Sequence, residues 1–330
     1  MRVEAFSQPR APQPLSNRPG ESSAWEDLLI RLLSFSVRVS SNSPSVLREI
    51  ASLYPANEGG QRPSSEGASV ELDVEERRTE DNSVRYLLRQ QGREVAAFGS
   101  ASDALLYVSN LINTNAAMSL RSSLLLHAGV VAHGDAGVLL PGASGAGKST
   151  LVAALCLNGF RYLSDDLGVL EIESLVLRPF LKAICLKEGG WTTLVAAFGM
   201  PAASVLSALA DGQTLRYLAA PDACSPSASV RVRYVMVPFR RPGPVSLTRC
   251  SRAQTLAHLA QHSLNLPRHG PAGIDALARL VEAAECYIIS YQDLRDAVEK
   301  VSSLVGHWHS QQASFAVGGA TRQQENSSDR

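Results

Sequence analysis

A glycine-rich segment in the middle of the chain has the residue types needed to hold a chain of phosphates. It consists of Gly142, Ala143, Ser144, Gly145, Ala146, Gly147, Lys148 and Ser149, followed by Thr150, and its first eight residues match the pattern G-x-x-x-x-G-K-[ST] in full. Glycines let the backbone fold around an oligophosphate with its N–H groups turned inward, and a helix beginning near Lys148 adds its positive end. We expect Lys148 to contact the β- and γ-phosphates and the Ser149 hydroxyl to bind Mg²⁺. Residues 142–150 therefore predict a site for ATP with Mg²⁺.

Two adjacent carboxylates, Asp165 and Asp166, follow Lys148 by 17 and 18 residues, after one expected helix and one short expected strand. A single β-α-β excursion of this kind returns the chain to the glycine-rich loop, so both side chains can reach the γ-phosphate. One can organise Mg²⁺ through water, and the other can accept the proton of an attacking hydroxyl. The residues alone leave these roles exchangeable, because neighbours at a strand end point to opposite sides. The alternative is a pair that only caps a turn.

A histidine, His127, lies in the apolar run before the loop. Taken alone, such a histidine is more often a packed, hydrogen-bonded core residue than a catalytic one. His307 and His309 flank Trp308 near the end of the chain, and we expect them to be solvated rather than to bind metal.

The composition of the whole chain limits the classes of function. The 330 residues include 31 Lys and Arg and 31 Asp and Glu, so the net charge of zero argues against a nucleic-acid surface spread over the protein. The apolar runs are too short for a membrane span, and the N-terminus lacks the pattern of a secretory signal. Five widely spaced cysteines without a CxxC pair favour reduced thiols over zinc or disulfides. We therefore expect a cytoplasmic protein with no nucleic-acid or membrane partner.

The elements that must position the loop and the aspartates alternate between strands and helices, which predicts an α/β fold. Around the loop, apolar runs predict strands over 124–132, 137–140 and 160–163, and a helix over 148–158 that Gly159 closes. Further along the chain we expect strands near 230–239 and 286–289, and helices over 253–262, 273–284 and 292–308.

The N-terminal part has a pattern of its own. Leu28, Leu29, Leu32 and Leu33 have helical spacing, 35–39 alternates as a strand does, and 44–54 predicts a helix capped by Ser43. After these we expect a polar loop over 57–67, a solvated hairpin edge at the charged run 75–81, a strand through 84–88 and a helix over 101–120. The predicted domains are a flexible leader at 1–24, an α/β domain at 25–120 that recruits or covers substrate, a P-loop domain at 121–310 and a disordered tail at 311–330.

From His127 to Asp166 the chain resembles the catalytic domain of HPr kinase/phosphorylase. That family has a histidine in the strand before the loop, a GxSGxGKS loop, a helix, a glycine and an Asp-Asp pair, with the spacing found here. The resemblance implies a P-loop kinase core with a mixed sheet and flanking helices. It also implies that His127 is an active-site histidine, that Lys148 binds phosphate and that Ser149 binds magnesium. Asp166 then corresponds to the proton acceptor, and we assign its neighbour Asp165 to the metal.

Segments further along, such as RPFLKAICLKEGGW and VMVPFRRPGP, are similar to a divergent HPr-kinase-related group. Members of that group accompany ribosomal-peptide tailoring systems and include kinases that phosphorylate a serine of a lasso-peptide precursor. The Glu-Ile-Arg-Gly-type signature that the HPr enzyme uses for phosphorolysis does not occur here, so we expect no phosphate-driven reverse reaction. Because HPr kinases form hexamers, the resemblance leaves a homo-oligomer open.

The residues and the resemblance together predict a kinase that transfers the γ-phosphoryl group of ATP to a serine hydroxyl of a protein or peptide. Arg178, Lys182 and Lys187 could add positive charge from what we expect to be a loop. The alternatives are a small-molecule kinase acting on a hydroxy acid or amino acid, a transport or motor ATPase, and a nucleotide-sensing scaffold. No LSGGQ-like signature supports the ATPase, and the pair Asp165 and Asp166 argues against an inactive scaffold.

Overall fold

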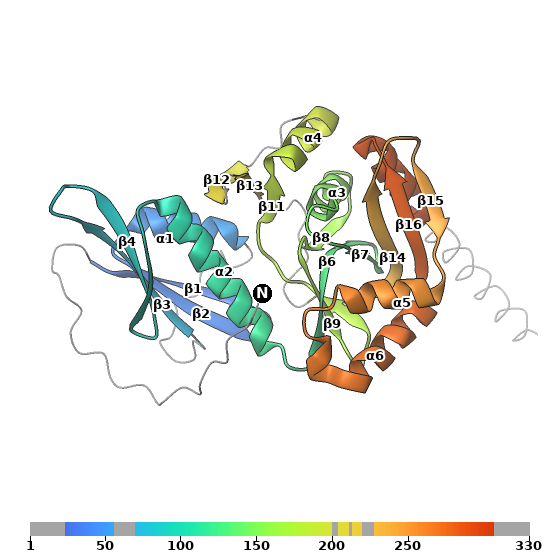
Figure 1. Cartoon of the computed structure of the whole chain (residues 1–330), viewed down its shortest axis with the longest axis horizontal. Coiled ribbons are helices and arrows are strands. Elements are labelled where there is room, and N and C mark those ends of the chain that lie inside the picture. The colour runs from blue at the N-terminus through green and yellow to red at the C-terminus, as the bar shows by residue number, and fades with distance from the viewer. Residues whose placement is uncertain (1–23, 56–69, 200–203, 211–212, 220–227, 307–330) are drawn as a thin grey trace, which may run out of the picture.

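The computed structural model describes residues 24–55, 70–199, 204–210, 213–219 and 228–306. Over these residues the chain is a mixed α/β protein with three sheets and helices packed against them (Figure 1). The predicted α/β class is therefore confirmed. Several predictions fall outside the described residues, namely the polar loop at 57–67, the solvated histidines His307 and His309, the tail, and all but the last residue of the leader.

The first sheet has five strands in the order β1-β2-β3-β4-β5. Its neighbouring strands are antiparallel except β2 and β3, which run parallel. Helices α1 (Pro44–Leu53) and α2 (Ala101–Ser119) cover one face of the sheet (Figure 1) and bury Ile50, Leu105 and Ile112 against it. We call residues 24–119 the N-terminal unit. Its strands are β1 (Glu26–Leu32), β2 (Phe35–Ser41), β3 (Val70–Arg78), β4 (Val84–Gln90) and β5 (Arg93–Phe98).

One element of this unit is a strand where the sequence predicts a helix. The helix expected at 28–33 is strand β1, which pairs with β2 along its whole length and turns at Leu33, where φ is 58°. Ile30 and Leu32 are buried at alternate positions, as in a strand. Adjacent leucines satisfy both helical and strand spacing, and the neighbouring strand β2 decides the outcome because it can form a hairpin.

The other N-terminal predictions are confirmed in type, since β2, α1, β4 and α2 stand where the sequence predicts them. Ser43 precedes α1 as expected, but its hydroxyl donates to Glu76 Oε2 at 2.6 Å and accepts from no backbone N–H of the helix, so it does not cap it. The charged run at 75–81 is only partly solvated, because Glu75 is buried and forms ion pairs with Arg77 and Arg89.

The second sheet has eight strands in the order β10-β9-β6-β7-β14-β16-β15, with β8 paired to β6. Strands β7, β14 and β16 run parallel, so their carboxyl ends meet at one edge, where open α/β sheets bind ligands. The five strands predicted for this region are confirmed as β6, β7, β8, β14 and β16. The bounds are β6 (Ser123–His133), β7 (Ala136–Pro141), β8 (Arg161–Ser164), β9 (Leu167–Glu171), β10 (Val176–Arg178), β14 (Val230–Arg240), β15 (Ser246–Arg249) and β16 (Glu285–Tyr291).

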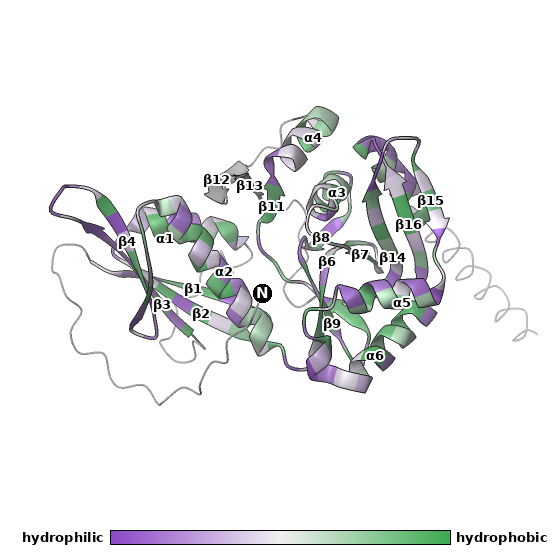
Figure 2. Ribbon diagram, viewed as in Figure 1, coloured by the Kyte–Doolittle hydropathy of each residue, from purple (hydrophilic) through white to green (hydrophobic). Residues whose placement is uncertain are grey.

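Helices cover both faces of this sheet. The core of one face combines α3 (Lys148–Cys156), α4 (Glu188–Phe198) and the helix at 294–306, and the core of the other combines α5 (Arg252–Gln261) and α6 (Leu266–Ala283). The strands between them carry mostly apolar residues (Figure 2), as expected for strands buried on both faces. The predicted helices at 148–158, 253–262 and 273–284 are confirmed in type, and so is the one at 292–308 over its described part, 294–306. Helix α6 begins earlier than predicted, with a kink at Gly270.

A third sheet, which the sequence did not predict, joins the two halves of the molecule. It has the order β11-β13-β12 and consists of β11 (Ile184–Lys187), β12 (Ser204–Ala210) and β13 (Gln213–Leu218). Strand β12 contacts α1 and α2, whereas β11 contacts α3. Phe180, Ala183 and Tyr217 are buried in the core of the N-terminal unit. The segment expected to be a loop around Lys182 and Lys187 is therefore an ordered bridge between the two larger sheets.

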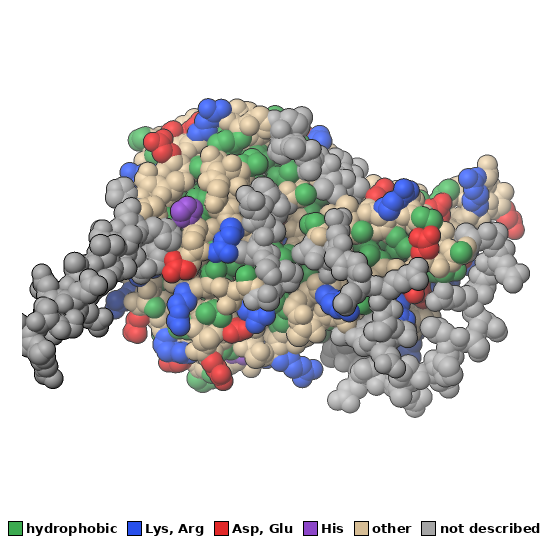
Figure 3. Space-filling view, turned by 180° about the vertical axis from the view of Figure 1, so that it is seen from behind, with side chains coloured by type: hydrophobic (Ala, Val, Ile, Leu, Met, Phe, Trp, Pro, Cys, Tyr) green, Lys and Arg blue, Asp and Glu red, His purple; other side chains and the backbone are tan. Residues whose placement is uncertain are grey.

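The described surface is mixed in charge. On the face in Figure 3, Lys and Arg side chains lie among Asp and Glu side chains, and the described residues of this face form no continuous basic stripe of the kind that binds nucleic acid. No helix in the described part of the chain is long and apolar enough to cross a membrane.

Candidate functional site

The glycine-rich loop joins β7 to α3 at the carboxyl edge of the three parallel strands. Gly145 and Gly147 have φ values of 85° and 90°, which glycine adopts without strain. Gly147 also has little room for a side chain, because a Cβ there would lie 3.0 Å from the Tyr291 hydroxyl and 3.5 Å from Arg240 Cδ. Helix α3 begins at Lys148, so the unpaired N–H groups of its first turn face the loop. The backbone therefore has the shape of an anion-binding cradle.

Lys148 is 5 % exposed, and its ammonium contacts the loop and β6. Its Nζ donates to the carbonyl oxygen of Ala143 at 3.0 Å and to Nε2 of His127 at 2.9 Å. Burial lowers the pKa of Lys148, while the charges of Asp166 and Asp165 act against this decrease. An ammonium has three N–H donors, so these two contacts leave one for a ligand in the loop.

His127 links the lysine to a carboxylate. Since the Lys148 ammonium can only donate, Nε2 of His127 accepts, and the ring proton of the neutral imidazole is on Nδ1. Nδ1 lies 3.2 Å from Oδ1 of Asp166, to which it donates. Burial, followed by the nearby Lys148 charge, lowers the pKa of His127, which favours this neutral form. The residue type alone left His127 between a core and a catalytic residue, and the family resemblance predicted an active-site position; the fold brings it into the cluster with Lys148 and Asp166.

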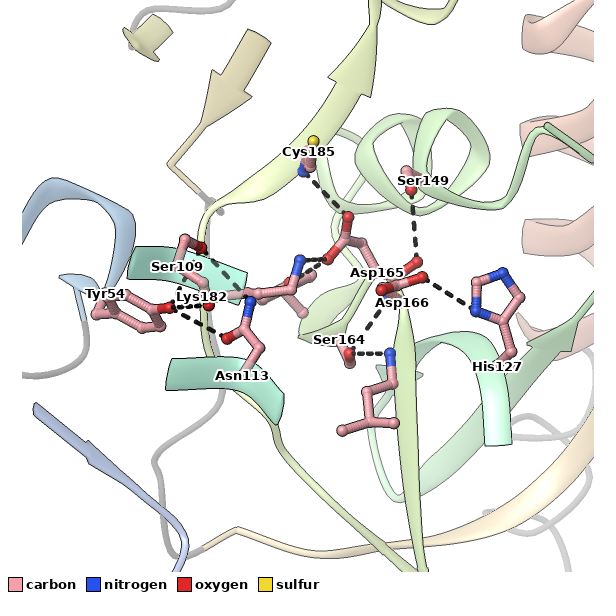
Figure 4. Close-up of polar contacts among 12 residues, drawn as sticks. Tyr54, Ser109, Asn113, His127, Ser149, Ser164, Asp165, Asp166, Lys182 and Cys185 are labelled. Carbon is pink, nitrogen blue, oxygen red and sulfur yellow. Dashed lines mark hydrogen bonds and ion pairs between the residues drawn. The ribbon is translucent and has the colours of Figure 1, made fainter. Parts of the chain in front are cut away.

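The two aspartates occupy the turn between β8 and β9 and point in different directions (Figure 4). The Asp166 side chain is 56 % exposed and faces His127. The Asp165 side chain is 1 % exposed and accepts from Lys182 Nζ at 2.7 Å, the backbone N–H of Cys185 at 3.0 Å and the Tyr162 hydroxyl at 3.2 Å. The turn thus holds one carboxylate inside the protein and presents the other to solvent.

These groups line one cavity of about 860 Å³ beside the glycine-rich loop. Among the residues predicted from the sequence, its walls include His127, Ser144, Gly145, Gly147, Lys148, Ser149, Thr150, Asp165, Asp166, Lys182 and Lys187. Gly142, Ala143 and Ala146 belong to the same loop but not to the cavity wall. Arg178 lies elsewhere, because it forms an ion pair with Glu171 at 2.9 Å. The fold therefore brings together nearly all of the candidate residues.

Two residues that sequence reasoning missed lie at the ends of the parallel strands beside the loop. Arg240, the last residue of β14, lines the cavity. Tyr291, the last residue of β16, is 1 % exposed, and its hydroxyl has no hydrogen-bond partner among the described residues. Burial raises the pKa of Tyr291 to about 12, and the charge of Arg240 acts against this increase. The available signal was the position of Arg240 directly after a predicted strand, which in a parallel sheet ends at the same edge as the loop.

The donors around the cavity fit magnesium bound together with a nucleotide. Within the described residues, no group of three or more His, Cys, Asp or Glu side chains could hold a metal ion. Magnesium at phosphate sites usually takes one or two protein oxygens and completes its shell with phosphate and water, and Ser149 and Asp166 offer such oxygens here. Asp165 as a metal ligand stays a prediction, because its carboxylate already accepts three hydrogen bonds from the protein.

Neither a protein-family model nor a curated protein matches this chain. What the site can do therefore follows from the geometry of its own residues: a backbone cradle, a buried lysine, and an exposed carboxylate that the lysine reaches through one histidine.

Proposed function

We propose that this protein is a kinase that transfers the γ-phosphoryl group of ATP to a hydroxyl group, with a serine of a protein or peptide as the acceptor. The observation that carries the proposal is the chain of contacts from Lys148 through His127 to Asp166. It begins at the glycine-rich loop and ends on an exposed carboxylate in the same cavity. A base beside the phosphate site is what separates phosphoryl transfer to a hydroxyl from nucleotide binding alone.

In this proposal each residue of the cluster has one task. The N–H groups at the start of α3 and the Lys148 ammonium bind the phosphates and offset the negative charge of the transferred group. Asp166 accepts the proton of the acceptor hydroxyl while the hydroxyl oxygen bonds to the γ-phosphorus and the bond to the β-phosphate oxygen breaks. His127 holds Asp166 through Nδ1–H and contacts Lys148 through Nε2, so it fixes the distance between the base and the phosphate lysine. Arg240, which lines the cavity beside Gly147, adds a second positive charge.

Magnesium would be held by the Ser149 hydroxyl together with the phosphates and water, and it would supply further neutralisation of phosphate charge. Asp165 then contributes by fixing the turn that carries Asp166. We also propose a core of the HPr-kinase type. Two features support this, namely the resemblance of residues 127–166 to that family and the parallel arrangement of β7, β14 and β16 around the loop.

The test is transfer from γ-labelled ATP to candidate serine-containing peptides, with Lys148→Ala and the exposed control Lys300→Ala beside the wild type. We expect Lys148→Ala to abolish transfer and to weaken nucleotide binding, because it removes the charge facing the phosphates, and Lys300→Ala to behave as wild type. Unchanged transfer in Lys148→Ala would refute the assigned site. Release of free phosphate without labelling of any acceptor would favour an ATPase, and labelling of free hydroxy acids or amino acids would favour a small-molecule kinase.

A further inference from the structure

The segment that ends in β11 is hydrogen-bonded to both halves of the molecule. The backbone N–H of Phe180 donates to the carbonyl oxygen of Leu163, in β8, at 2.9 Å. The backbone N–H of Ala183 donates to the carbonyl oxygen of Leu53, in the N-terminal unit, at 2.7 Å. Two residues later the backbone N–H of Cys185 donates to Asp165 at 3.0 Å. The side chains of Phe180 and Ala183 are buried in the core of the N-terminal unit. The position of this segment beside Asp165 therefore depends on that unit.

Lys182 lies in the middle of this segment and forms a buried ion pair with Asp165. The distance from Nζ to Oδ1 is 2.7 Å, and the two side chains are 11 % and 1 % exposed. Burial is the largest single influence and acts to lower the pKa of Lys182, but the charges of Asp165 and Asp166 and the hydrogen bond to Asp165, together with Cys185, outweigh it, so the pKa is raised. A buried carboxylate keeps its charge only while a partner compensates it, so Asp165 depends on Lys182.

A polar cluster of the N-terminal unit lies next to Lys182 (Figure 4). It consists of Tyr54, at the end of α1, and of Ser109 and Asn113, one turn apart on α2. The buried Tyr54 hydroxyl donates to Asn113 Oδ1 at 3.1 Å and lies 3.3 Å from the Ser109 hydroxyl. Burial raises the pKa of Tyr54 to about 12, and the Lys182 charge acts against this increase. The cluster is thus close enough to Lys182 for the ammonium charge to act on the Tyr54 hydroxyl.

The position of Asp165 also determines that of Asp166, because the two are consecutive in a tight turn. The carbonyl oxygen of Asp165 accepts from the Ser149 hydroxyl at 3.4 Å, and that of Asp166 accepts from the backbone N–H of Ala128 at 3.1 Å. The turn is therefore fixed on one side by α3 and β6 and on the other by Lys182. A shift of Asp165 would move the Asp166 carboxylate relative to Lys148.

We propose that Lys182 is a positioning residue through which the N-terminal unit orders the catalytic turn. The unit, through Tyr54 and the hydrogen bond between Leu53 and Ala183, holds Lys182 against Asp165, and this contact fixes Asp166 beside the glycine-rich loop. The inference rests on the proposed kinase function. It gives the N-terminal unit a part in turnover that is separate from any recruitment of substrate.

The first test compares Lys182→Met, Lys182→Arg and the exposed control Lys300→Met in the full chain. A displacement of the base by about 1 Å costs about 10²-fold in rate, so we expect kcat of Lys182→Met to fall by about that factor. The affinity for a fluorescent ATP analogue should stay within about threefold of wild type, because the loop and Lys148 are unchanged. Lys182→Arg keeps the charge and should recover most of kcat, and Lys300→Met should match wild type.

The second test needs no turnover. Hydrogen exchange of the peptide spanning 161–171 is measured in Tyr54→Phe, in Lys182→Met and in the control Tyr107→Phe, a tyrosine of α2 that packs on Phe98. Tyr54→Phe removes the hydroxyl and keeps the ring. We expect faster exchange in this peptide and a decrease of about tenfold in kcat, the factor that corresponds to the free energy of one hydrogen bond. Tyr107→Phe should leave both unchanged.

A double variant, Lys182→Met with Asp165→Asn, separates a loss of stability from a loss of positioning. It removes both buried charges at once, so no unpaired charge is left in the interior. We expect it to recover the stability lost in Lys182→Met while kcat stays low. Recovery of kcat in the double variant, wild-type kcat in Lys182→Met, or unchanged exchange in both Tyr54→Phe and Lys182→Met would overturn the proposal. A wild-type chain that binds ATP without transferring phosphoryl groups would overturn the kinase function instead, while the exchange comparison would still decide whether Lys182 orders the turn.

Discussion

At the scale of single residues, Asp165 and Asp166 show how neighbours in the chain acquire different chemistry. Their side chains leave a tight turn in different directions, so one is 1 % exposed and the other 56 % exposed. Asp165 has three protein donors around its carboxylate, including the Lys182 ammonium. Asp166 has one ring N–H and open space. Of the two carboxylates, that of Asp166 is therefore the more open to a ligand in the cavity, which suits its proposed role as proton acceptor.

The two Asp→Asn variants should differ in what they lose. Asp166→Asn removes the proposed proton acceptor but keeps the shape of the side chain, so we expect turnover to fall by about 10²–10⁴-fold with little change in stability. Asp165→Asn leaves Lys182 buried without its partner, so we expect the free energy of unfolding to fall by about 3–5 kcal/mol. Urea unfolding and labelled-ATP turnover on both variants measure the split. The reverse pattern, or a loss of turnover in Asp165→Asn that extra Mg²⁺ restores, would make Asp165 the metal-binding or catalytic residue.

The histidines around Lys148 predict a loss of stability in acid. The pKa values of His127, His258 and His262 all lie below the ordinary value of 6.5, with burial as the first cause. The folded state therefore favours the neutral form of each histidine. Above pH 6.5 these histidines are neutral in both the folded and the unfolded state, and the fold has its full stability. As the pH falls below 6.5, the unfolded state binds protons before the folded state does, so the free energy of unfolding decreases until the pH has passed the folded-state pKa. We expect the midpoint of thermal unfolding to fall between about pH 7.5 and about pH 5.5.

A His262→Gln variant should show a smaller decrease over the same range, because it removes one of the three titrating groups. Equal decreases in wild type and variant would mean that other groups control the acid behaviour.

At the scale of elements, the close packing of α4 against α3 shapes the cavity. Gly190, in the first turn of α4, lies so close to α3 that a Cβ there would be 2.5 Å from Thr150 Oγ1. Thr150 is in the first turn of the helix that follows the glycine-rich loop. The neighbouring Gly189 has open space around the same position. A glycine at 190 therefore sets the distance between the two helices, whereas a glycine at 189 does not.

This difference gives a matched pair of variants. Gly190→Ala should destabilise the protein by about 1–3 kcal/mol, as overpacking usually does, and should weaken nucleotide binding because it pushes against Thr150. Gly189→Ala should be neutral or slightly stabilising. Thermal unfolding and binding of a fluorescent ATP analogue measure both effects. Identical behaviour of the two variants would show that α4 can move away from α3 without cost.

At the scale of the whole molecule, the N-terminal unit and the eight-stranded sheet share buried residues. The core of the unit includes Phe180, Ala183 and Tyr217, which come from the bridging segment and the third sheet, and Leu125 and Val169, which come from the second sheet. Figure 1 shows β11 between the two halves. Because removal of either half would expose this surface, we expect the described parts to unfold together.

Phe180→Ala tests this coupling against the exposed Phe239→Ala. Phe180 is 1 % exposed and Phe239 is 55 % exposed. We expect Phe180→Ala to lower the free energy of unfolding by about 3–5 kcal/mol within a single transition, and Phe239→Ala to have little effect on stability. Urea unfolding followed by far-UV circular dichroism gives both quantities. Two separate transitions, with only one shifted by Phe180→Ala, would show that the halves fold independently.

Some parts of this protein depend only on local spacing and could be predicted from the order of its residues. The glycine-rich loop, its flanking strand and helix, and the adjacent aspartates are encoded within 40 residues, from His127 to Asp166, so motif and periodicity were sufficient to predict them. Where the spacing was ambiguous, as at 28–33, the pairing partner β2 decided between helix and strand.

Which side chains share the site depends on contacts between elements that are far apart in the chain. Arg240 and Tyr291 lie beside the loop because β14 pairs in parallel with β7, the strand that leads into the loop, and β16 pairs in parallel with β14. No local pattern encodes that pairing. The different surroundings of Asp165 and Asp166, and the ion pair between Asp165 and Lys182, likewise depend on the bridging segment packing between the two halves. Burial and strand pairing join residues far apart in the chain, and their free energies depend on the whole fold rather than on neighbouring residues.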